Sequence, residues 1–76
     1  MNPALRGITS SIVSAITMRA QAEGHGIERV REGGNSAMII LTNGDCYKWR
    51  VGNPVTYHTA DGRMTEIDVH DLFQNM

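Results

Sequence analysis

An Asn43-Gly44 dipeptide between two runs of strand-forming residues is the feature that most narrows the fold of this chain. Asn-Gly favours the left-handed backbone angles of a tight turn, and apolar runs on both sides make it a strong hairpin signal. Residues 36–42 before it are apolar on both faces, which is typical of a central or doubly covered strand. Residues 45–51 after it alternate, with Tyr47, Trp49 and Val51 on one face and Cys46, Lys48 and Arg50 on the other. The pattern predicts an antiparallel hairpin and leaves its register open.

A second hairpin is indicated by Ala60-Asp61-Gly62, which lies between residues 55–59 and 64–69. A two-residue loop would place Val55 opposite Asp68 and mix apolar and polar side chains on each face. A three-residue loop with a left-handed Gly62 instead places Val55 opposite Ile67 and Tyr57 opposite Thr65. The apolar pattern therefore selects the three-residue loop, with His58, Met64 and Glu66 on the other face. A weaker strand is expected at residues 27–32, where Arg29 and Arg31 share one side.

The first 24 residues carry a helix pattern. Asn2 is a suitable N-cap, Pro3 occupies the first helical position, and Gly24 suits a left-handed C-cap. Apolar residues recur between them at steps of three and four: Leu5, Ile8, Ile12, Ile16 and Ala20. Because Ser, Thr and Ile are not strong helix formers, this helix needs to pack its stripe on the sheet. Near the other end, Asp68 can cap a short helical turn whose Leu72, Phe73 and Met76 close one end of the core.

These segments predict the α+β class, with an N-terminal amphipathic helix packed on a four- to five-stranded antiparallel sheet and a short C-terminal helical turn. The 76 residues are expected to form a single domain, 1–76. A chain of this size buries only about 60% of its unfolded surface, so its core is thin and usually needs further support. The single cysteine, Cys46, cannot form an internal disulfide, and we therefore expect a homodimer or a complex with another protein.

The sequence shows no motif for catalysis, cofactor binding or metal binding. It has neither a phosphate-binding glycine loop nor a hydrolase elbow, and its histidines and Cys46 lack the close spacing of metal ligands. His58 and His70 are expected to be surface residues, and Cys46 a small buried filler. We therefore predict a protein that is not an enzyme and uses no cofactor. Without a signal peptide or a run of roughly 20 apolar residues, a cytoplasmic location is expected.

Excess apolar surface in the central hairpin indicates a binding role. Alternation sends Met38 and Ile40 one way and Ile39, Leu41 and Cys46 the other, and one helix can cover only one of these faces. The aromatic and arginine content of this hairpin is typical of interface anchors. The residues expected to bind a partner are Trp49, Tyr47, Arg50, Lys48, Ile39 and Leu41. The sequence leaves open whether Trp49 belongs to the core or to the interface.

The function predicted from these features is that of a small non-enzymatic protein-binding factor. Chains of this size without a catalytic motif include inhibitors of host proteins and defence complexes that phages and mobile elements encode. The alternative is a single-stranded nucleic-acid-binding module that uses Arg29, Arg31, Lys48, Arg50 and Trp49. The formal net charge of −1 disfavours this alternative, because nucleic-acid binders are normally basic. Alternation also sends Trp49 to the face away from Lys48 and Arg50.

Overall fold

The computed structural model describes residues 3–74, which form two helices and five strands. In chain order these are α1 (Pro3–Ala22), β1 (Ile27–Glu32), β2 (Ser36–Leu41), β3 (Cys46–Arg50), β4 (Val55–His58), β5 (Met64–Ile67) and α2 (Val69–Gln74). The strands form one antiparallel sheet in the order β1-β2-β3-β4-β5, so every strand pairs with its neighbours in sequence. The predicted α+β class is confirmed, with the higher of the two expected strand numbers.

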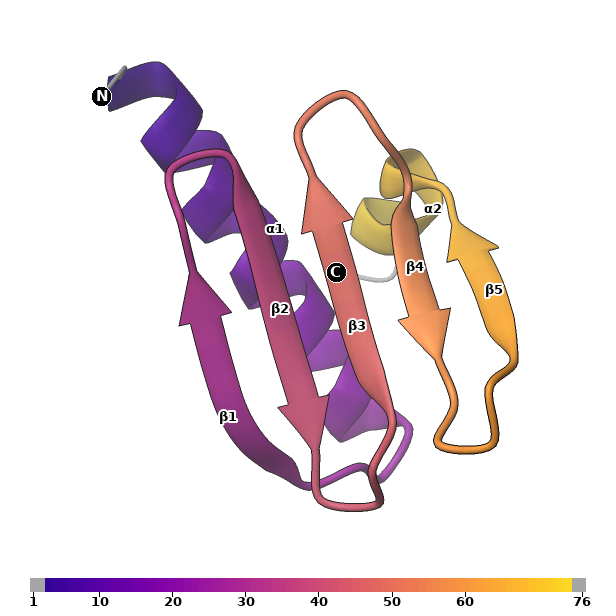
Figure 1. The fold of residues 1–76 in the computed structure, drawn as a ribbon. Helices are drawn as coiled ribbons and strands as arrows, with labels where there is room; N and C mark the ends of the chain where they lie inside the picture. The colour runs from indigo at the N-terminus through magenta and orange to yellow at the C-terminus, as the bar shows by residue number, and fades with distance from the viewer. Residues whose placement is uncertain (1–2, 75–76) are drawn as a thin grey trace.

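Both helices lie on the same side of the sheet (Figure 1). α1 runs obliquely behind β1, β2 and β3, while α2 lies behind the β4 half of the sheet. α1 packs on β1 and β2 and also contacts α2. Among residues 3–74, no element covers the other side of the sheet, which faces the viewer in Figure 1. The fold therefore has two layers, and one side of the sheet is exposed.

The hairpin at Asn43-Gly44 is confirmed, and a three-residue loop sets its register. The Leu41 N–H donates to the Asp45 carbonyl at 2.9 Å, and the loop residue Gly44 has a left-handed backbone with a φ of 93°. One loop residue more than in the two-residue form moves every following side chain to the other face. Cys46 therefore lies opposite Ile40, and the expectation that it shares a face with Leu41 is wrong.

The β4–β5 hairpin has the register that the apolar pattern predicted. Val55 lies opposite Ile67, and Tyr57 lies opposite Thr65. Gly62 has a φ of 96°, as the three-residue loop requires. The prediction is confirmed: this register places Val55, Tyr57 and Ile67 on the helix side and His58, Met64 and Glu66 on the other side.

The strand expected at residues 27–32 also forms, as the edge strand β1. A bulge between Ile27 and Arg29 shifts the register, which explains why its apolar residues do not alternate cleanly. Beyond the bulge, Arg29 and Arg31 lie opposite Ile40 and Met38, so the two arginines share one side of the sheet as expected.

α1 packs most of its predicted apolar stripe on the sheet. Its buried residues are Thr9, Ile12, Ala15, Ile16 and Ala20. Ile8 is 50% exposed, and the buried residue at this level of the helix is Thr9. The Thr9 hydroxyl donates to the Gly34 carbonyl at 3.1 Å. α1 ends at Ala22, and Gly24 (φ 82°) forms the predicted left-handed cap: the Gly24 N–H donates to the Gln21 carbonyl and the His25 N–H donates to the Ala20 carbonyl. Asn2 and the side chain of Leu5 lie outside the described part of the chain.

The core lies between the helices and the sheet. Besides α1, its buried side chains are Ala37, Ile39, Leu41, Tyr47, Trp49, Val55 and Leu72. Trp49 is 5% exposed, which makes it a core residue. Asp68 accepts a hydrogen bond from the His70 N–H at 2.7 Å and so caps α2 as predicted. Leu72 is buried, whereas Phe73 remains 38% exposed, and Met76 lies outside the described residues.

Candidate binding face

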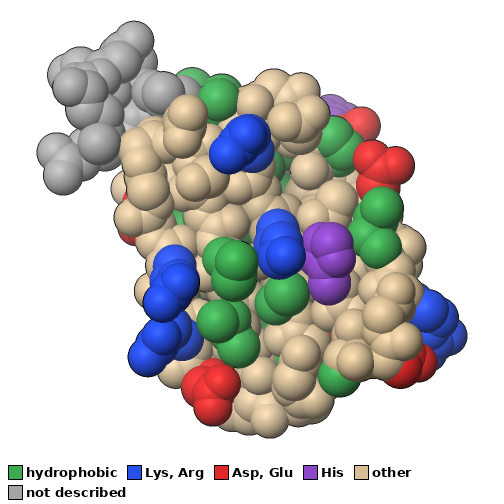
Figure 2. Space-filling view, in the orientation of Figure 1, with side chains coloured by type: hydrophobic (Ala, Val, Ile, Leu, Met, Phe, Trp, Pro, Cys, Tyr) green, Lys and Arg blue, Asp and Glu red, His purple; other side chains and the backbone are tan. Residues whose placement is uncertain are grey.

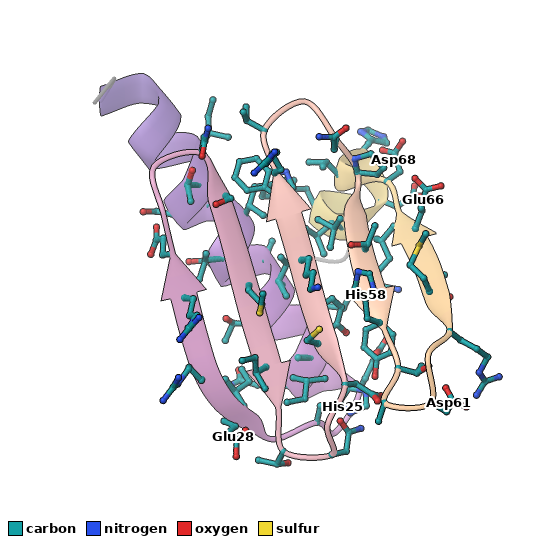
Figure 3. The ribbon with its side chains drawn as sticks, in the orientation of Figure 1. His25, Glu28, His58, Asp61, Glu66 and Asp68 are labelled. Atoms are coloured by element: carbon teal, nitrogen blue, oxygen red, sulfur yellow. The ribbon has the colours of Figure 1, made fainter. Side chains whose placement is uncertain are left out.

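Side chains from all five strands form the exposed side of the sheet, which we call the open face. The strand register places Arg29, Ile40, Cys46, His58 and Met64 in one rank across the sheet. A second rank contains Arg31, Met38, Lys48, Thr56 and Glu66. Ser36 and Arg50 lie opposite each other in the next rank. Figure 3 shows His58 on β4 and Glu66 on β5 at one side of this face.

An apolar stripe on the open face lies between two rows of cations. The stripe consists of Met38 and Ile40 on β2, and the cationic rows are Arg29 with Arg31 on β1 and Lys48 with Arg50 on β3. Neighbouring strands are about 4.8 Å apart, so the two rows, two strands apart, are separated by about 10 Å. Figure 2 shows hydrophobic side chains in the middle of the face with Lys and Arg side chains on both sides.

Ion pairing distinguishes these cations from the other described ones. Arg19 pairs with Glu23 at 3.5 Å, and Arg63 pairs with Asp61 at 3.3 Å. Among the described side chains, no ion pair involves a cation of the two rows, and all four of these cations are exposed. The register places Glu66 on the open face, two strands away from Lys48, and Glu28 lies at the β1 bulge on the edge of this face. The open face is therefore positive, although the chain has a formal net charge of −1.

A shallow depression of about 530 Å³ lies at the end of the open face near the β1–β2 and β3–β4 turns. Its lining joins the ends of both cationic rows, because Arg31, Lys48 and Arg50 all contribute to it together with Met38. The rest of the lining is Glu32, Gly33, Ser36, Ala37, Trp49, Asn53, Pro54 and Thr56. The volume falls in the range of ligand sites, and the three cations outnumber the one acid, Glu32, so the lining suits an apolar group that carries negative charge.

The residues predicted to bind a partner are divided between the two sides of the sheet. Lys48 and Arg50 are exposed on the open face. Ile39, Leu41, Tyr47 and Trp49 are between 0% and 5% exposed and lie beneath the helices, so the folded chain does not present them to a partner. This corrects the expected interface, because the apolar side chains on the uncovered side are Met38 and Ile40 in the centre, Cys46 beside them, and Met64, 55% exposed, on the edge strand β5. A signal was available in the sequence: the helices pack on the side that carries the largest apolar side chains.

Cys46 and His58 lie directly opposite each other on the open face. Among the described side chains no hydrogen bond joins them, and the His58 Nε2 atom lies instead 2.9 Å from the Thr56 hydroxyl. A thiol nucleophile needs a base held against it, and within the described residues His58 contacts Thr56 instead of the Cys46 thiol. Within the described part of the chain, no group of three or more His, Cys, Asp or Glu side chains is placed to hold a metal ion.

A second polar cluster lies on the helix side, at the end of the sheet where α1 ends. The Tyr57 hydroxyl donates to the Asp45 carboxylate, which also accepts the Ala60 N–H at 2.9 Å, and these bonds lower the pKa of Asp45. The Tyr57 ring packs edge-on against Tyr47 with centroids 4.8 Å apart, and the Tyr47 hydroxyl lies 3.5 Å from Glu23. Burial, with the nearby carboxylates, raises the pKa of both tyrosines to about 12. Because Asp45 joins the β2–β3 turn to the β4–β5 turn, we assign this cluster a structural role.

Comparison with known protein families, curated proteins and solved structures found no match to this chain. Neither helix of the described residues has the length and apolarity needed to cross a membrane. The geometry of the open face is therefore the basis for a functional assignment.

Proposed function

We propose that this chain is a small non-enzymatic protein-binding module that docks its partner on the open face. The observation that supports this most directly is the exposed apolar stripe between two rows of cations that have no ion partner among the described residues. Burial of the stripe would provide free energy of association, and the flanking charges would select the partner and speed its approach. A small inhibitor of the kind that phages and mobile elements encode would act in this way, by covering part of a host protein.

Single-stranded nucleic acid is the second candidate, because four cations share the open face. Modules that bind single strands on a sheet stack the bases on aromatic side chains. The register instead places Tyr47, Trp49 and Tyr57 on the helix side, where Tyr47 and Trp49 are 1% and 5% exposed. Among the described residues the open face carries no Phe, Trp or Tyr side chain, and this favours the protein partner.

Affinity capture from source cells tests the proposal with a matched pair of variants. Met38→Glu introduces a charge into the apolar stripe, whereas Met18→Glu introduces the same charge on α1, where the methionine is 50% exposed. We expect wild type and Met18→Glu to capture the same protein and Met38→Glu to lose it, with all three chains equally folded by circular dichroism. Capture that is unchanged by Met38→Glu would remove the open face as the docking surface. Capture that nuclease treatment abolishes would favour the nucleic-acid alternative.

A further inference from the structure

We infer that the partner presents an amphipathic α-helix whose apolar stripe is flanked on both sides by acidic side chains, and that this helix lies along β2. This inference rests on the proposed function and deepens it by stating the chemistry and the shape of the docking element.

The dimensions of the open face fit one helix. The two cationic rows are about 10 Å apart, and an α-helix with its side chains is about 10–12 Å wide. A helix along β2 therefore places its apolar side over Met38 and Ile40 and its flanks over the two rows. Residues on one face of a strand repeat about every 6.7 Å, close to the rise of about 6 Å between helical positions four apart. Apolar side chains four positions apart on the helix can therefore contact Met38 and Ile40 at the same time.

The charges of the open face select acidic flanks on that helix. Three of the four cations in the rows are arginines, whose planar guanidinium groups bind carboxylates through two hydrogen bonds. None of the four is paired within the described chain, so a carboxylate of the partner displaces no internal ion pair. The depression lies where the two rows end, and it offers the carboxylates at one end of the helix three cations, Arg31, Lys48 and Arg50, against one acid, Glu32. An uncharged or basic helix would leave these cations without partners.

A second copy of this chain does not supply such a helix. α1 contains no acidic residue between Pro3 and Ala22, and α2 is only six residues long. Two open faces brought together would place like charges against each other. The helix therefore belongs to a different protein, and a homodimer of this chain would use another surface.

Synthetic helical peptides test the inference with the intact chain. The probe is an 18-residue peptide with leucines in one stripe and glutamates on both flanks, and the control carries glutamine at the same flank positions. Fluorescence anisotropy titrations at 50 and 200 mM salt measure both affinities. We expect the glutamate peptide to bind about tenfold more tightly at low salt, because each of four exposed ion pairs contributes a small factor. This advantage should shrink at the higher salt concentration, where screening is stronger.

Charge-reversal variants locate the effect on the open face. Lys48→Glu combined with Arg50→Glu should weaken binding of the glutamate peptide about tenfold or more, whereas Arg63→Glu, on the β4–β5 turn, should change it less than twofold. Equal binding of the two peptides, or no binding of either, would overturn the acidic helix. Tighter binding of an 18-nucleotide oligothymidylate than of the glutamate peptide would overturn it in favour of nucleic acid. A dimer of the chain that Met38→Glu dissociates would overturn it in favour of a second copy. The proposed function fails by a different result, namely capture from source cells that Met38→Glu leaves unchanged.

Discussion

Two adjacent isoleucines of β2 point to opposite sides of the sheet, so truncating each of them measures how differently the two sides are covered. Ile39 lies opposite Val30 and Tyr47 and is 0% exposed on the helix side. Ile40 lies opposite Arg29 and Cys46 and is half-buried on the open face. We predict that Ile39→Ala destabilises the fold far more than Ile40→Ala, although both changes remove the same atoms from the same strand.

The magnitudes follow from what surrounds each side chain. Ile39→Ala should lower the free energy of unfolding by about 2–5 kcal/mol, as expected when a large aliphatic side chain is removed from a packed core. At about 0.05–0.15 kcal/mol per residue, the whole domain is stable by about 4–11 kcal/mol, so this change consumes a large fraction of the total. Ile40→Ala removes atoms that remain partly in contact with water in the folded state, and its cost should be about 1 kcal/mol.

Urea denaturation measures both values, with the fluorescence of Trp49 and far-ultraviolet circular dichroism as independent signals. Trp49 is the single tryptophan and lies in the core, so its emission reports on the same packing that Ile39 supports. Each curve is recorded at two protein concentrations a hundredfold apart. Equal losses for the two variants would refute the two-layer assignment. A cost of Ile40→Ala that grows with protein concentration would show that a second copy covers the open face.

Three further predictions concern the pH dependence of the tyrosine cluster and the C-terminal cap of α1. Asp45 has a lowered pKa, so the stability it contributes is present above its ordinary value of 3.8 and is lost as the pH falls through the folded-state value. Tyr57→Phe removes the hydrogen bond that is the largest cause of this lowered pKa. The urea midpoint, measured as a function of pH, should therefore decline less steeply below about pH 4 in this variant than in the wild type. The pKa of Tyr47 is shifted in the opposite direction, from 10.0 to about 12. Its contribution to the stability of the fold is therefore complete below pH 10 and is lost as the pH rises toward 12. Tyr47→Phe should therefore reduce the alkaline decline in the same assay, and an unchanged decline would contradict this. Finally, apart from the adjoining backbone, no described atom lies within 4 Å of a methyl group added at Gly7 or at Gly24, but only Gly24 has a positive φ, of 82°. In thermal unfolding, Gly7→Ala should stabilise by about 0.5–1 kcal/mol and Gly24→Ala should destabilise by about 1–2 kcal/mol, so shifts of the same sign would disprove the left-handed cap.

The sequence predicted those elements whose pattern admits a single arrangement. In the β4–β5 hairpin, the apolar residues of both strands match in only one register, so Val55 opposite Ile67 followed from the pattern. In the β2–β3 hairpin, β2 is apolar on both faces, so its pattern is compatible with β3 in the register of a two-residue loop and in that of a three-residue loop. The choice between the two registers depends on one loop residue, and that residue decides the position of Cys46.

The candidate site was only partly predictable for the same reason. The shared side of Arg29 and Arg31, and that of Lys48 and Arg50, followed from alternation within each strand. β2 by itself did not indicate the side that the helices cover, because it does not distinguish Ile39 from Ile40; the signal lay in β3, whose aromatic residues Tyr47 and Trp49 share the helix side. The absence of ion partners for the four cations, within the described residues, depends on how strands distant in sequence are ordered in the sheet. That order becomes visible only in three dimensions.

The cations also explain how an apolar stripe on an uncovered sheet stays compatible with a folded single chain. The long aliphatic stems of Arg and Lys lie along neighbouring apolar side chains while their charged ends remain in water. We attribute to such stems the partial burial of Met38 and Ile40, which are half-buried although no element of residues 3–74 lies over them. Because the rows carry like charge, stacking of two open faces is unfavourable, whereas an acidic surface is attracted from a distance. We therefore expect the same four side chains to oppose self-association through this face and to favour an acidic partner, so that the flanking charges, more than the apolar stripe itself, decide what the proposed docking face accepts.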